Sequence, residues 1–236
     1  MTFKSTLIFV PFSTLIRNYR QKEKHMKRFQ KLTLALGLAS ALTLSLQAKG
    51  DVADVTTGTL IPYTSEKAAT GDVKEVYAQV KKAFGMVPAP LMQHSVNPQM
   101  LKVLWSQFGA LHNEHFSPKL QAMMRMTVAA SDGLACDYCV GFNEGMLLNM
   151  FKMDMKEIIA VKKDPSAAKS LDEKDKKMLI MMVDSARNPK KVNKAQLDDL
   201  RKLGWNDKDI FDGIKMATQM VAMTLLVDTL KIPADF

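Results

Sequence analysis

The pattern that most limits how this chain can fold is a helix-start signal followed by apolar residues at every third or fourth position. A capping side chain stands before a proline at Asn97-Pro98 and at Ser117-Pro118, and proline suits the first position of a helix. Near the end of the chain, apolar residues share one helical face: Ile210, Ile214, Ala217, Val221 and Leu225. No stretch alternates long enough to predict a sheet. The sequence therefore predicts an all-α fold.

Further signals set the expected helix boundaries. A segment capped by Thr70 or Asp72 should end at Gly85, a residue suited to the left-handed conformation that closes a helix. Three later pairs have the spacing of a capping box, in which a cap residue and the third helical residue bond each other's backbone: Ser170 with Glu173, Asn193 with Gln196, and Asn206 with Asp209. We expect a single domain of about seven or eight helices joined by short loops.

The positive charge of the chain is concentrated at its start. The formal net charge is +9 over 236 residues, but residues 1–48 hold eight of the 33 lysines and arginines and one of the 24 acidic residues. Residues 49–236 are close to neutral, with 25 basic and 23 acidic side chains. A nucleic-acid-binding domain should carry a basic excess of its own, so no nucleic-acid partner is predicted.

Residues 26–48 have the three parts of a secretory signal peptide. Basic residues open the segment, an apolar run of 15 residues spans 32–46, and Ala48 supplies the small residue at the cleavage position. The run is shorter than the roughly 20 apolar residues that a bilayer-spanning helix needs, although an uncleaved anchor is the alternative. We expect export to the periplasm and no membrane attachment after cleavage.

The expected organisation has four parts. Residues 1–25 are interpreted as an upstream extension read from an early start codon, and residues 26–48 as the signal peptide. Residues 49–62 are expected to be a linker, and the helical domain occupies 63–236.

The only cysteines of the chain, Cys136 and Cys139, are three positions apart. On a helix this spacing puts both thiols on one face, close enough to form a disulfide or to bind one metal ion. A cysteine in the first helical turn has its thiolate stabilised by free backbone N–H groups, which favours redox chemistry and points to Cys136 as the more reactive thiol. The alternative is a structural disulfide, although so short a loop contributes little stability.

The residues around this pair resemble a known family. A-A-S-D-G ahead of C-D-Y-C, in the middle of a helical chain, is similar to the alkylhydroperoxidase AhpD and carboxymuconolactone decarboxylase superfamily, particularly its peroxidase-related branch. The likeness covers residues 60–236 and includes four further segments: L-D-E-K-D-K-K-M-L from Leu171, N-P at Asn188, L-R-K-L-G-W-N-D-K-D-I from Leu200, and V-D-T-L-K-I-P from Val227.

The resemblance implies a packed helical fold that forms homo-oligomers, and a thiol peroxidase mechanism without metal or bound cofactor. In this mechanism Cys139 attacks the peroxide, and Cys136 converts the resulting sulfenic acid into a disulfide. A dithiol protein partner then reduces that disulfide. The family therefore assigns the attacking role to Cys139, whereas the position of the pair at a helix start favours Cys136.

The sequence lacks the proton relay that the resemblance implies. The family places a histidine four residues after the second cysteine and a glutamate twelve residues before the first, and these positions hold Asn143 and Met124. Asn143 lies on the cysteine face and can hydrogen-bond, but an amide cannot act as a base near neutral pH.

Three side chains are candidates to support the pair in its place. His112 and His115 end a predicted helix and could reach the cysteines from a neighbouring helix or subunit, although exposed histidines are also common at such an end. Glu144 is adjacent to Asn143 but lies about 140° around the helix from Cys139, so a surface carboxylate is the alternative.

Several other residue patterns carry structural expectations. Asp132 and Asp137 flank Cys136, and their charge would raise the pKa of its thiol. Gly141 and Gly145, four residues apart, indicate the close approach of another helix. Nine methionines could suggest a copper site, but their positions in apolar helical stripes favour core packing: Met123, Met124, Met126, Met178, Met181, Met182, Met216, Met220 and Met223.

The sequence thus predicts a secreted thiol oxidoreductase that reduces peroxide or another small molecule, or exchanges disulfides with a partner protein. One alternative is a non-catalytic helical oligomer or ligand-binding protein whose cysteines form a permanent disulfide. A lactone decarboxylase is the third possibility, and it ranks last because that branch of the family does not depend on the cysteine pair.

Overall fold

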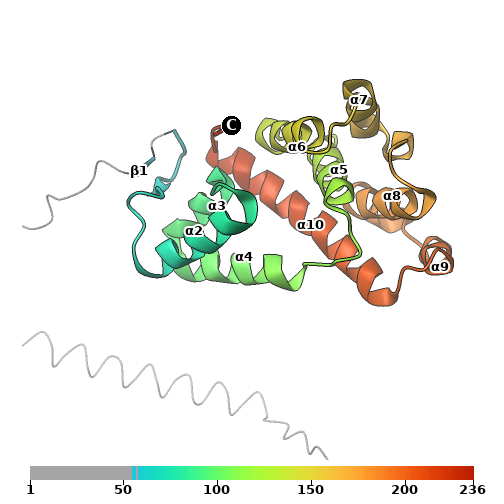
Figure 1. The fold of residues 1–236 in the computed structure, drawn as a ribbon, viewed down its shortest axis with the longest axis horizontal. Helices are drawn as coiled ribbons and strands as arrows, with labels where there is room; N and C mark the ends of the chain where they lie inside the picture. The colour runs from blue at the N-terminus through green and yellow to red at the C-terminus, as the bar shows by residue number, and fades with distance from the viewer. Residues whose placement is uncertain (1–54, 57) are drawn as a thin grey trace, which may run out of the picture. The chain divides into compact units, whose positions relative to one another are not determined.

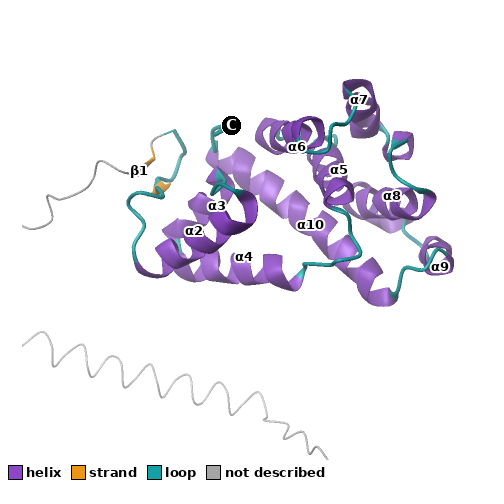
Figure 2. Cartoon of the chain, in the orientation of Figure 1, coloured by secondary structure: helices purple, strands orange, loops and turns teal. Residues whose placement is uncertain are grey.

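The computed structural model of the protein describes residues 55–56 and 58–236, and these residues are almost entirely helical (Figure 2). The expected extension 1–25 and signal peptide 26–48 lie outside the described residues. Nine α-helices are present in the described part: α2 (Gly71–Phe84), α3 (Ala89–Gln93), α4 (Pro98–Ala110), α5 (Pro118–Ala129), α6 (Asp137–Asn149), α7 (Met155–Lys163), α8 (Glu173–Arg187), α9 (Lys194–Lys202) and α10 (Asp207–Leu230). The all-α prediction is confirmed, and the short α3 brings the number of helices above the expected seven or eight.

Short elements connect these helices. Two two-residue strands, β1 (Val55–Thr56) and β2 (Tyr63–Thr64), pair antiparallel within and just after the expected linker. Single 3-10 turns follow α3, α7 and α8 at His94–Val96, Pro165–Ala167 and Pro189–Lys191. The backbone of Leu60 donates to the carbonyl of Leu230 at 2.9 Å, so the segment before β2 is attached to the end of α10.

Most of the predicted caps are confirmed. The side chain of Asn97 accepts the backbone N–H of Met100 at the start of α4, and Ser117 does the same for α5. Both bonds are present in the capping boxes of α9 and α10, and Gly85 closes α2 in the left-handed conformation. These short-range signals placed the helix ends correctly because they involve only neighbouring residues.

The capping box predicted at Ser170 is wrong. The N-cap of α8 is Asp172, whose carboxylate accepts the backbone N–H of Asp175 at 2.7 Å. The backbone N–H of Ser170 instead donates to Glu157 at 2.7 Å, and its carbonyl accepts from Lys119 at 3.3 Å. Ser170 is therefore held by α5 and α7, outside the helix that it was expected to begin.

The longest helix, α10, connects the two groups of helices in the domain. In Figure 1 it runs between α2–α4 and the group formed by α5–α9, and it packs against α5 and α8. Partly buried Met220 and Met223 contact the apolar clusters on both sides of this helix. By length and composition α10 could also span a membrane, but its packing is that of a core helix.

The nine methionines pack in the apolar core, as predicted. Seven of them are buried, and Met220 and Met223 are partly buried against core clusters. A close contact between helices occurs at Gly213 of α10, where an added Cβ would lie 3.2 Å from atoms of Met178 and Met182.

The helix approach predicted at Gly141 and Gly145 is wrong. A Cβ added at Gly141 would lie 3.1 Å from the ring of Phe236 in the C-terminal tail, and one at Gly145 would meet nothing within 4 Å. A close contact does occur at Gly141, but the contacting residue, Phe236, belongs to the C-terminal tail, and the helical pattern could not indicate it.

Candidate functional site

The cysteine pair opens helix α6. Cys136 is the N-cap residue, and its sulfur accepts the backbone N–H of Cys139 at 3.2 Å, the role usually taken by a serine or aspartate oxygen. Cys139 is the third residue of the helix and therefore lies in the first turn, where free N–H groups favour a negative charge. The helix-start argument thus applies to Cys139 rather than to Cys136.

A tight loop brings Cys136 to this position. After α5 the backbone N–H groups of Leu134 and Ala135 both donate to the carbonyl of Ser131, and Cys136 donates back to Ala129 at 3.1 Å. Gly133 adopts a φ of +81°, and Ala135 adopts +38°. A positive φ is unfavourable for a residue with a side chain, so the loop holds strained backbone directly before the cysteine.

Arg187, the last residue of α8, holds this loop from outside. Its guanidinium donates to the Ser131 hydroxyl at 2.6 Å and to the Thr127 carbonyl at 2.5 Å. Burial lowers the pKa of this arginine, while the nearby Asp132 and Asp184 carboxylates oppose that effect. Arg187 therefore joins the end of α8 to the end of α5 and to the loop that leads to Cys136.

Both thiols are free and buried among apolar side chains. Cys136 is 0% exposed and Cys139 is 4% exposed, and both pack with Ala129 and Val227. The hydroxyl of Thr224, which is fully buried on α10, lies 3.9 Å from the sulfur of Cys139. The one sequence signal for this contact is a hydroxyl-bearing residue within the mostly apolar α10.

The surroundings move the pKa values of the two thiols in opposite directions. The hydrogen bond that the Cys136 thiol makes to Cys139, together with burial, raises the pKa of Cys136. The same bond lowers the pKa of Cys139, against the opposing effect of burial, and the Thr224 hydroxyl lowers it further. Cys139 is therefore the thiol that loses its proton first, and Cys136 is the donor beside it.

The two positions of the missing relay have structural roles. Asn143 is buried, and its side-chain amide donates to the backbone carbonyl of Cys139 at 2.7 Å, so it supports the helix at the cysteine. Met124 is fully buried in the apolar core of α5. Neither residue can accept a proton from a thiol.

The other predicted supporting residues lie outside this group. Glu144 is partly buried and forms an ion pair with Lys162 of α7. His115 bonds through Nδ1 to Asp209 at 3.0 Å. Asp209 precedes Thr224 by 15 residues on α10, which is about 22 Å along the helix axis at about 1.5 Å per residue.

His112 is exposed just after α4 and is not part of the cluster of side chains around the thiols. The structure therefore brings Cys136, Cys139 and Asn143 together, but it does not bring His112, His115 or Glu144 to them within one chain.

A carboxylate that the sequence did not indicate also acts on the cysteines. The negative charge of Asp228 on α10 raises the pKa of both thiols. Asp132 and Asp137, which are neighbours of Cys136 in the sequence, are exposed.

A shallow hollow of about 350 Å³ opens beside the pair. Its walls come from the start of α6 and the end of α10: Ala135, Asp137, Tyr138, Val227, Asp228, Lys231 and Ile232. Tyr138, Val227 and Ile232 also belong to the apolar cluster that contains both cysteines. The hollow and the thiols therefore share three side chains of one apolar cluster.

The C-terminal tail covers the cysteine helix next to this hollow. Asp235 accepts hydrogen bonds from the Tyr138 hydroxyl at 2.7 Å and from the backbone N–H of Ala89 at 2.6 Å. The ring of Phe236 packs edge-on against Tyr138 at 5.4 Å. Burial and the Asp235 carboxylate raise the pKa of Tyr138, which keeps its hydroxyl protonated.

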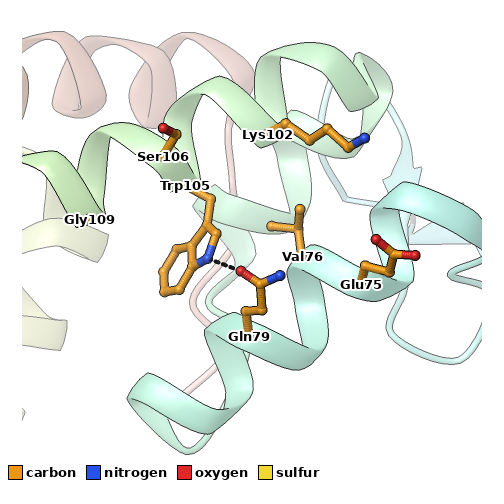
Figure 3. A pocket seen from close by; sticks show the side chains of 7 residues that line it. All are labelled: Glu75, Val76, Gln79, Lys102, Trp105, Ser106 and Gly109. Carbon is orange, nitrogen blue, oxygen red and sulfur yellow. Dashed lines mark hydrogen bonds between the residues drawn. The ribbon is translucent and has the colours of Figure 1, made fainter.

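A second hollow, of about 460 Å³, lies between α2 and α4 (Figure 3). Three of its polar side chains already have partners, since the Trp105 indole donates to Gln79 at 2.6 Å and Lys102 pairs with Asp72. No cysteine or histidine lines it. In the described part of the chain, no group of three or more histidine, cysteine, aspartate or glutamate side chains is arranged to hold a metal ion.

Comparisons with known proteins find similarity in structure. No family model matches the sequence, and no curated protein matches it. An uncharacterised AhpD-core, peroxidase-related protein from Ralstonia eutropha JMP134 aligns with a TM-score of 0.62 and 18% identity, over 76% of this chain and 94% of that chain. A peroxidase-related protein from Silicibacter sp. TM1040 aligns with a TM-score of 0.63 and 17% identity, over 78% and 95% of the two chains.

A third solved structure broadens the set of chemistries found with this architecture. The debrominase Bmp8, as a cysteine-to-alanine variant in complex with 2,3,4-tribromopyrrole, aligns with a TM-score of 0.57 and 15% identity, over 76% of this chain and 92% of that chain. At these identities the likeness establishes the fold. The protein therefore has the AhpD-like fold of these peroxidase-related proteins. This is the fold that the resemblance of its cysteine motif and flanking segments implied.

Proposed function

We propose that this protein is an AhpD-like thiol oxidoreductase in which Cys139 attacks an oxidised substrate and Cys136 resolves the product. The observation that carries the proposal is the position of Cys139 in the first turn of α6, where its sulfur lies 3.9 Å from the buried Thr224 hydroxyl and the Cys136 sulfur caps its backbone N–H. Because Thr224 and the Cys136 thiol both stabilise a thiolate on Cys139, the attacking role that the family resemblance implies has a physical basis in this chain.

With a hydroperoxide as substrate, the Cys139 thiolate attacks one oxygen of the O–O bond. An S–O bond forms, the O–O bond breaks, and the leaving alkoxide takes a proton to become an alcohol. The Cys136 sulfur then attacks Cys139, the S–O bond breaks, and water leaves as the disulfide forms. A dithiol protein supplies two electrons and two protons to restore both thiols.

Thiol–disulfide exchange is the same chemistry with a different electrophile. The Cys139 thiolate would attack a sulfur of the partner's disulfide, and Cys136 would release the mixed disulfide. A hollow of about 350 Å³ beside the pair is at the small end of the range for small-molecule sites, which supports a small peroxide as the first substrate to test.

Single cysteine variants test the proposal. The reduced protein is mixed with excess hydrogen peroxide or an organic hydroperoxide, and oxidant loss is followed by stopped flow. Cys139→Ser should abolish consumption, whereas Cys136→Ser should still react once per chain and leave a sulfenic acid that dimedone traps. No consumption by the reduced wild-type protein, together with a disulfide that mild reductants do not open, would support the structural-disulfide alternative instead.

We also propose that the protein acts as a homo-oligomer after export. The signal-like segment at 26–48 supports export, and the resemblance to the peroxidase-related proteins supports an oligomer. Intact mass should give a mature chain that begins near Lys49, and sedimentation should give a mass above the monomer. A retained leader would contradict the first expectation, and a monomer the second.

A further inference from the structure

The end of α10 presents a carboxylate to the cysteine pair, at a place where the cysteine helix has no acid or base of its own. Thr224 contacts the sulfur of Cys139, and residues three and four positions later occupy the same face of α10 one turn further on. These residues are Val227, which packs in the cluster of both cysteines, and Asp228. The register of α10 therefore directs Asp228 toward the pair.

The hollow beside the pair confirms this direction. Asp228 lines it on the α10 side, and Ala135 and Tyr138, which bracket Cys136 in the sequence, line it on the other side. The negative charge of Asp228 raises the pKa of both thiols. Asp228 thus borders the hollow and acts electrostatically on both sulfur atoms.

The side chain of Asp228 is free to exchange protons. It is partly exposed, and within residues 58–236 its carboxylate makes no hydrogen bond or ion pair. The other acidic residue that lines the hollow, Asp137, is exposed. Lys231 also lines the hollow, and Asp235 is bonded to Tyr138.

We propose that Asp228 is the proton acceptor and donor of the cysteine pair and takes the place of the relay that Asn143 and Met124 cannot provide. This inference rests on the proposed thiol chemistry. As Cys139 attacks a hydroperoxide, its proton passes to the Asp228 carboxylate, directly or through one water molecule. The protonated Asp228 then returns that proton to the alkoxide that leaves.

The second step uses the same group. When Cys136 attacks the sulfenic acid on Cys139, the Cys136 proton passes to Asp228, and from there to the departing hydroxide, which leaves as water. Each turnover therefore returns Asp228 to its ionised state. A carboxylate within reach of both thiols explains how one residue could serve both steps.

The effect of Asp228→Asn on the reaction rate distinguishes proton transfer by Asp228 from a purely electrostatic effect of its charge. A fixed negative charge near the pair raises the pKa of Cys139 and opposes formation of its thiolate. If Asp228 were only a charge, Asp228→Asn would lower the pKa of Cys139 and speed the reaction. If Asp228 moves protons, the same variant lowers the pKa of Cys139 and yet slows the reaction.

The experiment compares the wild-type protein, Asp228→Asn and the control Asp207→Asn, which changes an exposed carboxylate at the other end of α10, in full-length mature protein. Two quantities are measured: the pH dependence of alkylation by iodoacetamide, which reports the pKa of Cys139, and the rate of oxidation by hydrogen peroxide near neutral pH. We expect Asp228→Asn to shift alkylation to lower pH and to slow oxidation by about a hundredfold, the size of a general acid–base contribution. Asp207→Asn should change neither quantity by more than about twofold, and Asp228→Glu should restore part of the rate.

An unchanged or faster oxidation in Asp228→Asn would overturn the inference while leaving the proposed function intact. If the reduced wild-type protein does not consume peroxide, the same comparison is made on its reaction with oxidised glutathione, where the attacking thiol must also lose a proton. If neither oxidant reacts with the wild-type protein, the proposed function fails and this inference fails with it. Circular dichroism of each variant separates loss of rate from loss of fold.

Discussion

At the scale of single residues, Thr224 adds to the effect of Cys136 in stabilising a thiolate on Cys139. Its buried hydroxyl lies 3.9 Å from the sulfur and lowers the pKa of the thiol. Cys139 should therefore react as a thiolate above that pKa and lose reactivity as the pH falls through it.

Thr224→Val should raise the pKa of Cys139 and move the pH profile of thiol alkylation upward, because the hydroxyl that stabilises the thiolate is gone. The variant loses one buried hydroxyl and its hydrogen bond, a contribution of about 0.5–1.5 kcal/mol to stability, so it should still fold. Alkylation rates from pH 5 to 10 measure the shift, and Thr218→Val, an exposed threonine of the same helix, is the control. A profile that does not move in Thr224→Val would show that the hydroxyl does not act on the sulfur.

The sequence could identify the cysteine pair and the absence of the family relay, because both depend on positions within one short stretch and its neighbouring helix. It could not identify Thr224 or Asp228 as site residues. They lie 85 and 89 residues after Cys139, and only the packing of α10 against α5 brings them to the pair.

At the scale of elements, the loop between α5 and α6 depends on an arginine from a third helix. Arg187 of α8 bonds Ser131 and Thr127, and the loop contains the positive φ of Ala135 immediately before Cys136. A strained backbone persists only where its surroundings hold it. The position of the Cys136 sulfur as the cap of α6 therefore depends on the end of α8.

Arg187→Met should destabilise the protein by about 1–3 kcal/mol, because the buried Ser131 hydroxyl loses its donor and the buried Thr127 carbonyl keeps only the bond from Ser131. It should also alter the alkylation rate of the cysteines through the loosened loop. Denaturant unfolding and alkylation measure the two effects. The control, Arg201→Met, removes an arginine from exposed ion pairs with Asp198 and Asp207 and should cost less than about 1 kcal/mol. Equal losses in the two variants would contradict a special role for Arg187.

Helix ends were predictable where the cap uses only local groups. The boxes of α9 and α10 and the caps of α4 and α5 needed no information from elsewhere in the fold. Ser170 failed because tertiary bonds to Glu157 and Lys119 take its backbone groups, and Asp172 is an equally suitable cap two residues later. The spacing of residue types along the sequence does not indicate long-range contacts of this kind.

At the scale of the whole molecule, a buried polar cluster joins the two groups of helices. Asn113, in the loop after α4, donates to Asp209 at 2.8 Å and to Asp212 at 3.0 Å at the start of α10. His115 bonds the same Asp209. Burial alone would raise the pKa of Asp209, but the hydrogen bonds from Asn113, His115 and Asn206 outweigh it and bring the pKa below its ordinary value.

A lowered carboxyl pKa means that the ionised group stabilises the fold above the pKa of the unfolded chain, about 3.9, and that this contribution is lost as the pH falls through the folded-state value. The free energy of unfolding of the wild-type protein should therefore fall below about pH 4 more steeply than that of Asp209→Asn. Urea unfolding from pH 2.5 to 7 measures both curves, with the exposed Asp207→Asn as control. Parallel curves for the wild-type protein and Asp209→Asn would contradict the assignment.

The methionine-filled core has a consequence for how the protein would respond to an oxidant. Hydrogen peroxide converts methionine to its sulfoxide, a polar group that disrupts apolar packing. The six methionines of α5 and α8 are at most 2% exposed, whereas Met100, Met150 and Met155 are 43% exposed or more. Oxidative damage should therefore begin at surface positions, where a sulfoxide is readily hydrated, and the interior sulfur atoms remain protected for as long as the chain stays folded.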